Sequence, residues 1–293
     1  MNKLVNDIES LLKQYNSLNI EQAIDWEKYN HYSIVHHSTS IEGSSLTEEE
    51  TQMLLDENLT AKGKPLEHHN MQKDHYKALL FVLASAKTKK SISVAFIKEI
   101  SCLLMQNTGS IYNTALGSFD SSKGDFRLLN VRAGDTRFVD FTKIPELIDL
   151  YCKEMKNEII KIKTIKDVLI TSFDAHFNLV SIHPFADGNG RISRLMMNYV
   201  QHYHNIPLAI VFKEYKADYY KALVDSRSNE NMKAFYIFML EQYKKMINLE
   251  IQKVHNSQIG HIIKKGSKKG RGMSMIFQCN VHNLFPFYCK FFL

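Results

Sequence analysis

Length, composition and charge exclude several classes of protein. The chain has 293 residues, of which 44% are hydrophobic and 23% charged, and its formal net charge is +6. This is enough apolar sequence for one large or two modest domains, so a disordered chain and a small disulfide-stapled domain are excluded. No apolar leader follows Met1, and the apolar run 78–84 is too short to cross a bilayer. We therefore expect a cytoplasmic protein without a membrane span.

Cysteine and histidine spacing does not predict a metal site. The four cysteines show neither C-x-x-C spacing nor the density of a disulfide framework, so we expect reduced thiols at Cys102, Cys152, Cys279 and Cys289. Two histidine doublets, His36-His37 and His68-His69, could suggest a metal. Adjacent residues point to different faces of a helix, so we reject a metal as the leading interpretation.

The first functional candidate in chain order is Glu42. Gly43 is typical of a helix stop, and Thr47-Glu-Glu-Glu50 is a capping-box pattern that opens the next helix. A glutamate in the last helical turn faces the negative end of the dipole, at a cost of about 0.3–1 kcal/mol unless a cation lies nearby. Ser38, four residues earlier, shares its face of the helix. The alternative is an exposed carboxylate at a helix end.

Residues 124–139 are the clear exception to a helical pattern. β-Branched and aromatic residues flank Ala133-Gly-Asp135, which predicts a β-hairpin, and an ordinary surface hairpin is the alternative to a functional one. From Ile144 the pattern is helical, and we expect the Ile- and Lys-rich segment 157–166 to continue that helix. Val168–Val180 and Gly188–His204 are predicted to pair as a helix–loop–helix hairpin.

The loop of this hairpin is the most informative stretch of the chain, His183-Pro-Phe-Ala-Asp-Gly-Asn-Gly-Arg-Ile-Ser-Arg194. Apolar residues follow it at helical spacing, so it opens onto a helix N-terminus, where free N–H groups and the macrodipole favour an anion. Gly188 and Gly190 place no Cβ between these amides and a phosphate.

The side chains of the loop suit phosphate chemistry. Arg191 and Arg194 can present planar guanidinium groups to phosphate oxygens. Asp187 is a hard oxygen ligand, and Mg²⁺ typically takes one or two carboxylates plus substrate phosphates. His183 can accept a proton near neutral pH. A turn followed by a solvated helix face would explain the Asp, Gly and Asn, but it demands neither His-Pro-Phe before them nor two arginines after them.

The stretch resembles the signature of the Fic family, H-P-F-x-(D/E)-G-N-G-R-x-x-R, at every specified position. The resemblance implies transfer of AMP from ATP to a Ser, Thr or Tyr hydroxyl of a target protein or of the chain itself, with release of pyrophosphate. Glycine at position 190, where the kinase-like Doc branch carries lysine, is the AMP-transferring form.

The resemblance also implies a role for each residue of the loop. His183 would deprotonate the target hydroxyl, and Asp187 would hold Mg²⁺ against the α- and β-phosphates. A buried Phe185 would anchor the loop. The remaining residues would bind phosphate through the loop amides or through guanidinium groups: Gly188, Asn189, Gly190, Arg191 and Arg194.

Three further segments resemble parts of Fic proteins. Ser38-Thr-Ser-Ile-Glu42-Gly43 is similar to the inhibitory motif (S/T)-x-x-x-E-(G/N), whose glutamate would pair with Arg194 and block a productive γ-phosphate position. The predicted hairpin corresponds to the flap, whose edge would align an extended target segment through backbone hydrogen bonds; its residues are Val131, Arg132 and Ala133. Tyr219 and Tyr220 lie where the family places residues around adenine, and core packing is the competing explanation.

The resemblance implies an all-α, mainly helical Fic fold, a helical bundle with a small β-hairpin flap. We divide the chain into an N-terminal helical region with the inhibitory helix (1–66), a Fic core with flap and catalytic loop (67–250) and a tail (251–293). The tail has seven Lys or Arg and no acid. Its basic run 264–271 is typical of a solvated linker, whereas its apolar end 273–293 needs a cover, which a second protomer could supply.

Two alternatives to AMP transfer remain open. The same site could remove AMP, with Glu42 aligning a water, as in bifunctional or predominantly de-AMPylating relatives. In a non-enzyme alternative, the chain senses nucleotide and uses its basic tail on nucleic acid or a partner. A protein that only binds nucleotide would not need His183, yet the sequence retains it. This argues against the second alternative, and we regard nucleic acid as an unlikely partner.

Overall fold

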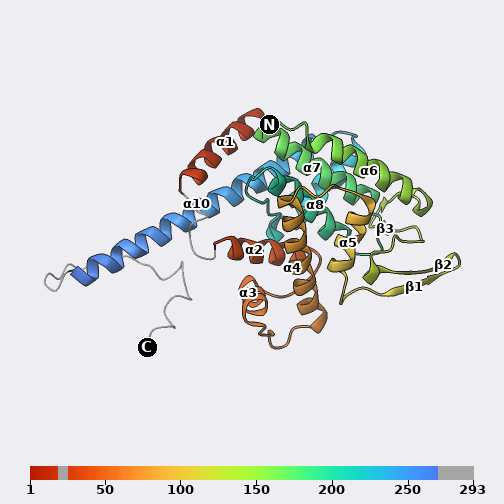
Figure 1. The fold of residues 1–293 in the computed structure, drawn as a ribbon, viewed down its shortest axis with the longest axis horizontal. Coiled ribbons are helices and arrows are strands. Elements are labelled where there is room, and N and C mark those ends of the chain that lie inside the picture. Colours follow the sequence, from red (N-terminus) through yellow and green to blue (C-terminus); the bar gives the residue numbers. More distant parts are fainter. Residues whose placement is uncertain (19–25, 270–293) are drawn as a thin grey trace. The chain divides into compact units, whose positions relative to one another are not determined.

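The computed structural model describes residues 1–18 and 26–269, without the side chains of Trp26 and residues 257–269. Its elements, in chain order, are α1 (Asn2–Ser17), α2 (Trp26–Ile41), α3 (Glu48–Glu57), α4 (Leu66–Lys87), α5 (Val94–Leu104), β1 (Ile111–Thr114), β2 (Gly117–Asp120), η2 (Ser121–Lys123), β3 (Arg132–Ala133), β4 (Thr136–Arg137), η3 (Phe141–Lys143), α6 (Ile144–Ile159), α7 (Ile165–Ile182), α8 (Asn189–Tyr203), η4 (Lys213–Tyr215), α9 (Lys216–Ser228) and α10 (Lys233–Lys269). The predicted mainly helical fold is confirmed (Figure 1).

The chain divides into two compact units, Met1–Ile251 and Gln252–Leu293. All elements that bear on the site belong to the first. Of the second unit, the structure describes the part of α10 that ends at Lys269. Arg271, the apolar segment 273–293 and the cysteines at 279 and 289 lie outside the described residues.

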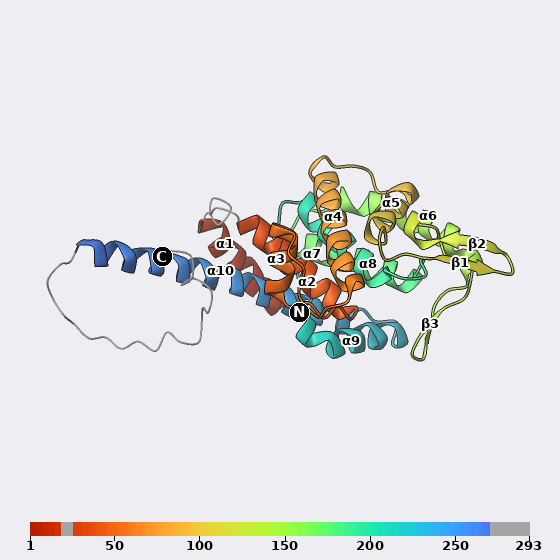
Figure 2. The same cartoon turned by 90° about the horizontal axis from the view of Figure 1, so that it is seen from below.

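Helix α8 is the centre of the first unit. It packs against α7 and α4, and Figures 1 and 2 show it among the other helices of the bundle. Every residue from Arg191 to Gln201 is buried. The polar ones have partners: Ser193 Oγ donates to the Asn189 carbonyl at 2.7 Å, and Gln201 Nε2 donates to Ser172 Oγ at 3.1 Å. This burial fixes the helix N-terminus that carries the signature loop.

The helix boundaries follow the predicted signals in most places. Thr47 caps α3 in a complete capping box with Glu50, as expected. The predicted hairpin of α7 and α8 is confirmed within three residues at each end. Segment 157–166 does not continue the helix from Ile144, however. Helix α6 ends at Ile159, and Thr164 starts α7 with its own capping box, which the Ile- and Lys-rich composition obscured.

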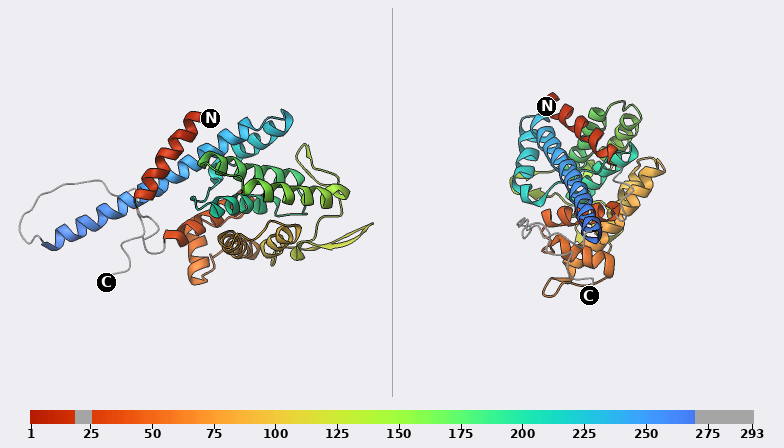
Figure 3. Two further views of the ribbon diagram at one scale, coloured as in Figure 1. Left: turned by 45° about the horizontal axis from the view of Figure 1, so that its top comes forward. Right: turned by 90° about the vertical axis from the view of Figure 1, so that its left-hand side faces the viewer.

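Two small antiparallel hairpins extend from one end of the helical unit (Figures 2 and 3). The predicted one is β3–β4, with Gly134-Asp135 as its turn and Arg132 opposite Arg137. The other, β1–β2, was not predicted from the sequence. Its strands have four residues each, and their short alternation is a weak signal. Tyr112 stacks on Phe119 across this second pair at 4.9 Å.

The described part of the chain contains two of the four cysteines, most of the histidines and helices α1–α10. Cys102 and Cys152 are free thiols, as predicted, and burial raises the pKa of Cys152 to about 12. Across residues 1–18 and 26–269, no group of three or more His, Cys, Asp or Glu side chains is placed to hold a metal. None of the helices in those ranges is long and apolar enough to cross a bilayer.

Candidate active site

The signature loop joins two helix ends in a fixed geometry. His183 terminates α7 in a left-handed conformation with φ +54°, and Gly188 starts α8 with φ +80°. The Asn189 side chain closes the loop from within: its Oδ1 accepts from the Phe185 N–H at 3.0 Å, and its Nδ2 donates to the Phe185 carbonyl at 2.8 Å. Phe185 is 1% exposed, so the predicted apolar anchor is present.

The start of α8 presents backbone N–H groups to this loop. The helical ladder begins with the bond from the Ile192 N–H to the Gly188 carbonyl, 2.9 Å long. The N–H groups of Asn189, Gly190 and Arg191 precede that ladder, and such groups bind anions. Asn189 was predicted to bind phosphate; in the structure its side chain holds the loop, while its backbone N–H is among those that precede the helical ladder.

His183 is held as a neutral imidazole. Its ring stacks on Phe138, with centroids 3.7 Å apart and planes 16° apart. Its Nδ1 lies 3.3 Å from the Val180 carbonyl. Because a carbonyl only accepts, this contact places the proton on Nδ1 and leaves the Nε2 lone pair available. Burial, reinforced by Arg127 and Arg227, lowers the pKa of His183 to about 4, against opposing effects of Val180 and Glu42. The ring is therefore unprotonated at neutral pH.

Arg127 is a site residue that the sequence did not reveal. It is 0% exposed, and all three of its side-chain nitrogens donate to backbone carbonyls: Nε to His183 at 2.8 Å, Nη1 to Leu129 at 2.7 Å and Nη2 to Val139 at 2.7 Å. Its backbone N–H also donates to the Pro184 carbonyl at 3.0 Å. Arg127 thus ties both sides of the hairpin base to the signature loop. A lone arginine in a hairpin sequence carries no spacing pattern that would predict this.

Residues of the β3–β4 hairpin and its base line an open groove. The groove has a volume of about 540 Å³ and is lined by Asn130, Val131, Arg132, Arg137, Phe138 and Asp140. Two of the three predicted flap residues, Val131 and Arg132, line it, whereas Ala133 is an exposed strand residue next to the turn. Phe138, which lines this groove, also stacks on the His183 ring.

Arg191 and Asp187 form a pair at the mouth of the loop. Arg191 Nη2 lies 3.1 Å from Asp187 Oδ2; the arginine side chain is 1% exposed and that of the aspartate 61%. Arg191 Nε and Nη1 are buried and have no hydrogen-bond partner in the part of the chain that is described. The alternative of a solvated arginine face is therefore wrong, because Arg191 and Arg194 are both buried.

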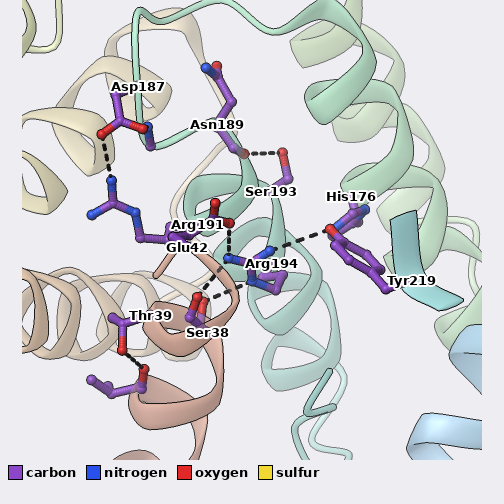
Figure 4. Close-up of polar contacts among 12 residues, drawn as sticks. Ser38, Thr39, Glu42, His176, Asp187, Asn189, Arg191, Ser193, Arg194 and Tyr219 are labelled. Carbon is purple, nitrogen blue, oxygen red and sulfur yellow. Dashed lines mark hydrogen bonds and ion pairs between the residues drawn. The ribbon is translucent and has the colours of Figure 1, made fainter. Parts of the chain in front are cut away.

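Arg194 is bound by the segment predicted to be inhibitory (Figure 4). Its Nη2 lies 2.6 Å from Glu42 Oε1 and donates to the Ser38 carbonyl at 2.9 Å, while its Nε donates to Ser38 Oγ at 2.9 Å. Burial, the largest single effect, would lower the pKa of Arg194, but Glu42 and Tyr219 together outweigh it and the pKa is raised. Glu42 lies just beyond α2, whose last residue is Ile41, rather than in its last turn.

Gly190 makes room for this ion pair. A Cβ on Gly190 would collide with the Glu42 carboxylate and would lie 3.1 Å from Arg194 Nη1. The glycine predicted to bring the helix N-terminus close to an anion thus also leaves space for the Glu42 carboxylate, just after α2. Glu42 and a bound phosphate would compete for the same guanidinium, because the carboxylate already occupies one face of Arg194.

The two tyrosines lie in different surroundings. Tyr219 is 1% exposed; its hydroxyl accepts from Arg194 Nη1 at 3.4 Å and shares a hydrogen bond of 2.8 Å with His176 Nε2. The structure therefore brings Tyr219 behind Arg194. Tyr220 is 41% exposed, with its ring 5.4 Å from that of Tyr219. His176, which sequence reasoning missed, supports Arg194 through this hydroxyl.

The match to known proteins agrees with the loop geometry. Residues 91–201 match the model of the Fic/DOC family. The chain is 27% identical over 259 residues to Protein adenylyltransferase Fic of Drosophila erecta, which is 87% of this chain and 49% of that protein. It is 27% identical over 226 residues to Protein adenylyltransferase fic-1 of Caenorhabditis elegans, 75% of this chain and 42% of that one. The chain thus spans about half the length of the curated relatives it matches.

Solved structures show the same fold. Fic-1 (residues 134–508) from C. elegans superposes with a TM-score of 0.73 at 24% identity, over 87% of this chain and 73% of that one. A Fic domain containing signaling protein from Bacteroides thetaiotaomicron gives a TM-score of 0.74 at 20% identity, over 85% and 97%.

The contacts of Arg127 predict a measurable effect on the hairpin. Replacing it in Arg127→Met leaves three carbonyls without their donor, which should lower the free energy of unfolding by about 2–4 kcal/mol. Urea unfolding measures the loss, and hydrogen–deuterium exchange of residues 129–139 should become faster. Arg132→Met, at an exposed arginine of the same hairpin, is the matched control. If hydrogen–deuterium exchange of residues 129–139 were as slow in Arg127→Met as in Arg132→Met, the role of Arg127 would be contradicted.

Proposed function

Because this chain belongs to the Fic/DOC family, we propose that it is a protein adenylyltransferase, which transfers AMP from ATP to a Ser, Thr or Tyr hydroxyl of a target protein or of the chain itself. One observation carries the proposal: the neutral His183, held between Val180 and Phe138, lies one loop away from a helix N-terminus backed by two buried arginines. A base for the hydroxyl and an anion site for the triphosphate are thereby joined on one rigid loop.

The reaction follows from these positions. His183 Nε2 takes the proton of the target hydroxyl, and the hydroxyl oxygen forms a bond to the α-phosphorus of ATP. The bond from that phosphorus to the oxygen bridging the α- and β-phosphates breaks, and pyrophosphate leaves with the electron pair. The free amides at the start of α8, those of Asn189 and Gly190, bind the α- and β-phosphates, Gly188 lets the phosphates approach without a Cβ in the way, and the unpaired nitrogens of Arg191 receive an outer phosphate.

The donor set near the loop fits Mg²⁺ held jointly with the nucleotide. Asp187 offers an exposed carboxylate next to the anion site, and no cluster of three or more potential ligands accompanies it within the described ranges. Mg²⁺ is commonly bound in this way, by one or two carboxylates plus phosphates. When bound, the ion would neutralise charge on the α- and β-phosphates. Asp187 is placed for this by its hydrogen bond from the Gly188 N–H, 2.6 Å long, and by Arg191.

We further propose that Glu42 inhibits the enzyme. Its carboxylate and the γ-phosphate would compete for Arg194, and without that arginine the triphosphate cannot be aligned for attack. Ser38 holds the guanidinium on the side of α2 through two hydrogen bonds. Tyr219 would then contribute to the nucleotide site through Arg194, and the exposed ring of Tyr220 remains the candidate for contact with adenine. Val131, Arg132 and Ala133 form the edge that would pair with the target.

The role of His183 can be tested directly. His183→Ala should leave folding and ATP binding largely unchanged, since the imidazole acts on the hydroxyl and not on the phosphates. AMP incorporation should fall by about 10²–10⁴-fold. The measurement is transfer of labelled AMP to the protein itself and to a lysate, with nucleotide binding followed separately by calorimetry. Equal labelling by variant and parent would contradict the assignment.

The proposed metal ligand predicts a dependence on divalent ions. Asp187→Ala should raise the Mg²⁺ concentration needed for half-maximal ATP binding by about tenfold or more, because the α- and β-phosphates lose the carboxylate that shares their cation. The unfolding midpoint should also fall, because the buried Arg191 loses its ion-pair partner, so binding is measured well below that midpoint. Calorimetric titration of ATP at several Mg²⁺ concentrations measures the shift. A variant that binds ATP as tightly as the parent at limiting Mg²⁺ would refute this role.

The inhibitory pair predicts a gain of activity. A hydrogen bond to a charged group contributes about 1.5–3 kcal/mol, so Glu42→Gly should raise the initial rate of AMP incorporation by about ten- to a hundredfold. Arg194→Ala should be inactive, and the double variant should match it, since releasing an absent arginine achieves nothing. An unchanged rate in Glu42→Gly would remove the inhibitory assignment and leave the His183 site intact.

The same variants separate the alternatives. If the site instead removes AMP, with Glu42 aligning the attacking water, the parent should release AMP from a labelled target protein. Glu42→Gly should then leave the label in place. If the chain only senses nucleotide, Glu42→Gly should bind ATP better yet transfer nothing.

A further inference from the structure

The flap carries an unusual pair of charges. Arg132 on β3 lies directly opposite Arg137 on β4, so both side chains project from the same face of the hairpin. Like charges in such a pair repel and destabilise the hairpin. Both arginines are exposed, and neither takes part in an ion pair with any residue that the structure describes. The hairpin thus maintains an uncompensated positive pair at its edge.

The nearby acids do not neutralise this pair. Asp140 lines the same groove, but its carboxylate accepts from Asn130 Nδ2 at 2.9 Å, from the Thr142 N–H at 3.0 Å and from Thr142 Oγ1 at 2.6 Å. These hydrogen bonds, that of Thr142 first, lower the pKa of Asp140 to about 2. The carboxylate is therefore committed to its own turn. Asp135, in the hairpin turn, forms no ion pair with either arginine.

The positive pair is close to the chemistry. Arg132, Arg137 and Phe138 line one groove, and Phe138 stacks on the His183 ring at 3.7 Å. A target segment lying in this groove with its hydroxyl at His183 would pass the two guanidinium groups within a few residues. The strand edge fixes such a segment through its backbone and reads little of its sequence, so side-chain selectivity must come from groups like these.

We propose that this groove selects target segments that carry an Asp or Glu close to the acceptor hydroxyl. The carboxylate would lie between Arg132 and Arg137, whose planar groups suit bidentate contact with carboxylate oxygens, and it would relieve the repulsion between them. This inference rests on the proposed AMP transfer and adds the chemical class of its target.

The test compares two synthetic peptides with a central threonine, one flanked by Glu and the other by Gln. With full-length Glu42→Gly protein, kcat/KM for AMP incorporation should be about three- to tenfold higher for the Glu peptide, and the preference should shrink as salt is raised. The preference should disappear when Arg132→Gln and Arg137→Gln are added. Lys13→Gln with Lys62→Gln, at exposed lysines of α1 and the α3–α4 loop, removes the same charge and should preserve it.

The outcomes distinguish this inference from the proposed function. Equal rates for the two peptides, or a preference that survives loss of both arginines, would overturn the inference while AMP transfer stands. If Glu42→Gly protein labels neither peptide nor itself, the proposed function fails. In that case, the binding of both peptides to His183→Ala protein is measured by fluorescence anisotropy. Tighter binding of the Glu peptide, lost when both arginines are replaced, supports the inference. Equal binding of the two peptides overturns it.

Discussion

The burial of Arg194 in the middle of α8 is the constraint on which the rest of the site depends. A guanidinium that is 4% exposed must be neutralised and hydrogen-bonded, because an unpaired buried charge costs several kcal/mol. In this chain Glu42 and Ser38 supply the partners from one side and Tyr219 from the other. The charge therefore holds α2, α8 and α9 in one arrangement.

A second buried arginine, Arg127, stabilises the other end of the loop through hydrogen bonds. Arg127 saturates three carbonyls that belong to the hairpin base and to His183. The two arginines thus hold the two ends of the loop separately: Arg127 holds the end at His183, and Arg194 holds the first turns of α8 against α2. Gly190 adjoins the contact between Glu42 and Arg194, because a Cβ at this position would force the Glu42 carboxylate to shift.

Much of this site could be predicted from sequence because its parts are local. The loop from His183 to Arg194, the hairpin turn at Gly134-Asp135 and the capping box at Thr47 each depend on residues a few positions apart. The break between α6 and α7 was missed, since the Thr164 cap lies in a stretch whose composition suits a helix. The β1–β2 hairpin was missed because strands of four residues leave a weak pattern.

The sequence by itself determined the helical class and the order of residue types in the signature loop, since each depends on patterns of residues close together in the chain, whereas the pairing of Glu42 with Arg194 was only implied by the family resemblance. Only the tertiary structure decided how deeply the arginines are buried, that Arg127 ties the hairpin to His183, and that Tyr219 lies behind Arg194 while Tyr220 faces outward. The reason is physical: these features depend on contacts between residues 25 to 156 positions apart, which are set by the packing of whole helices.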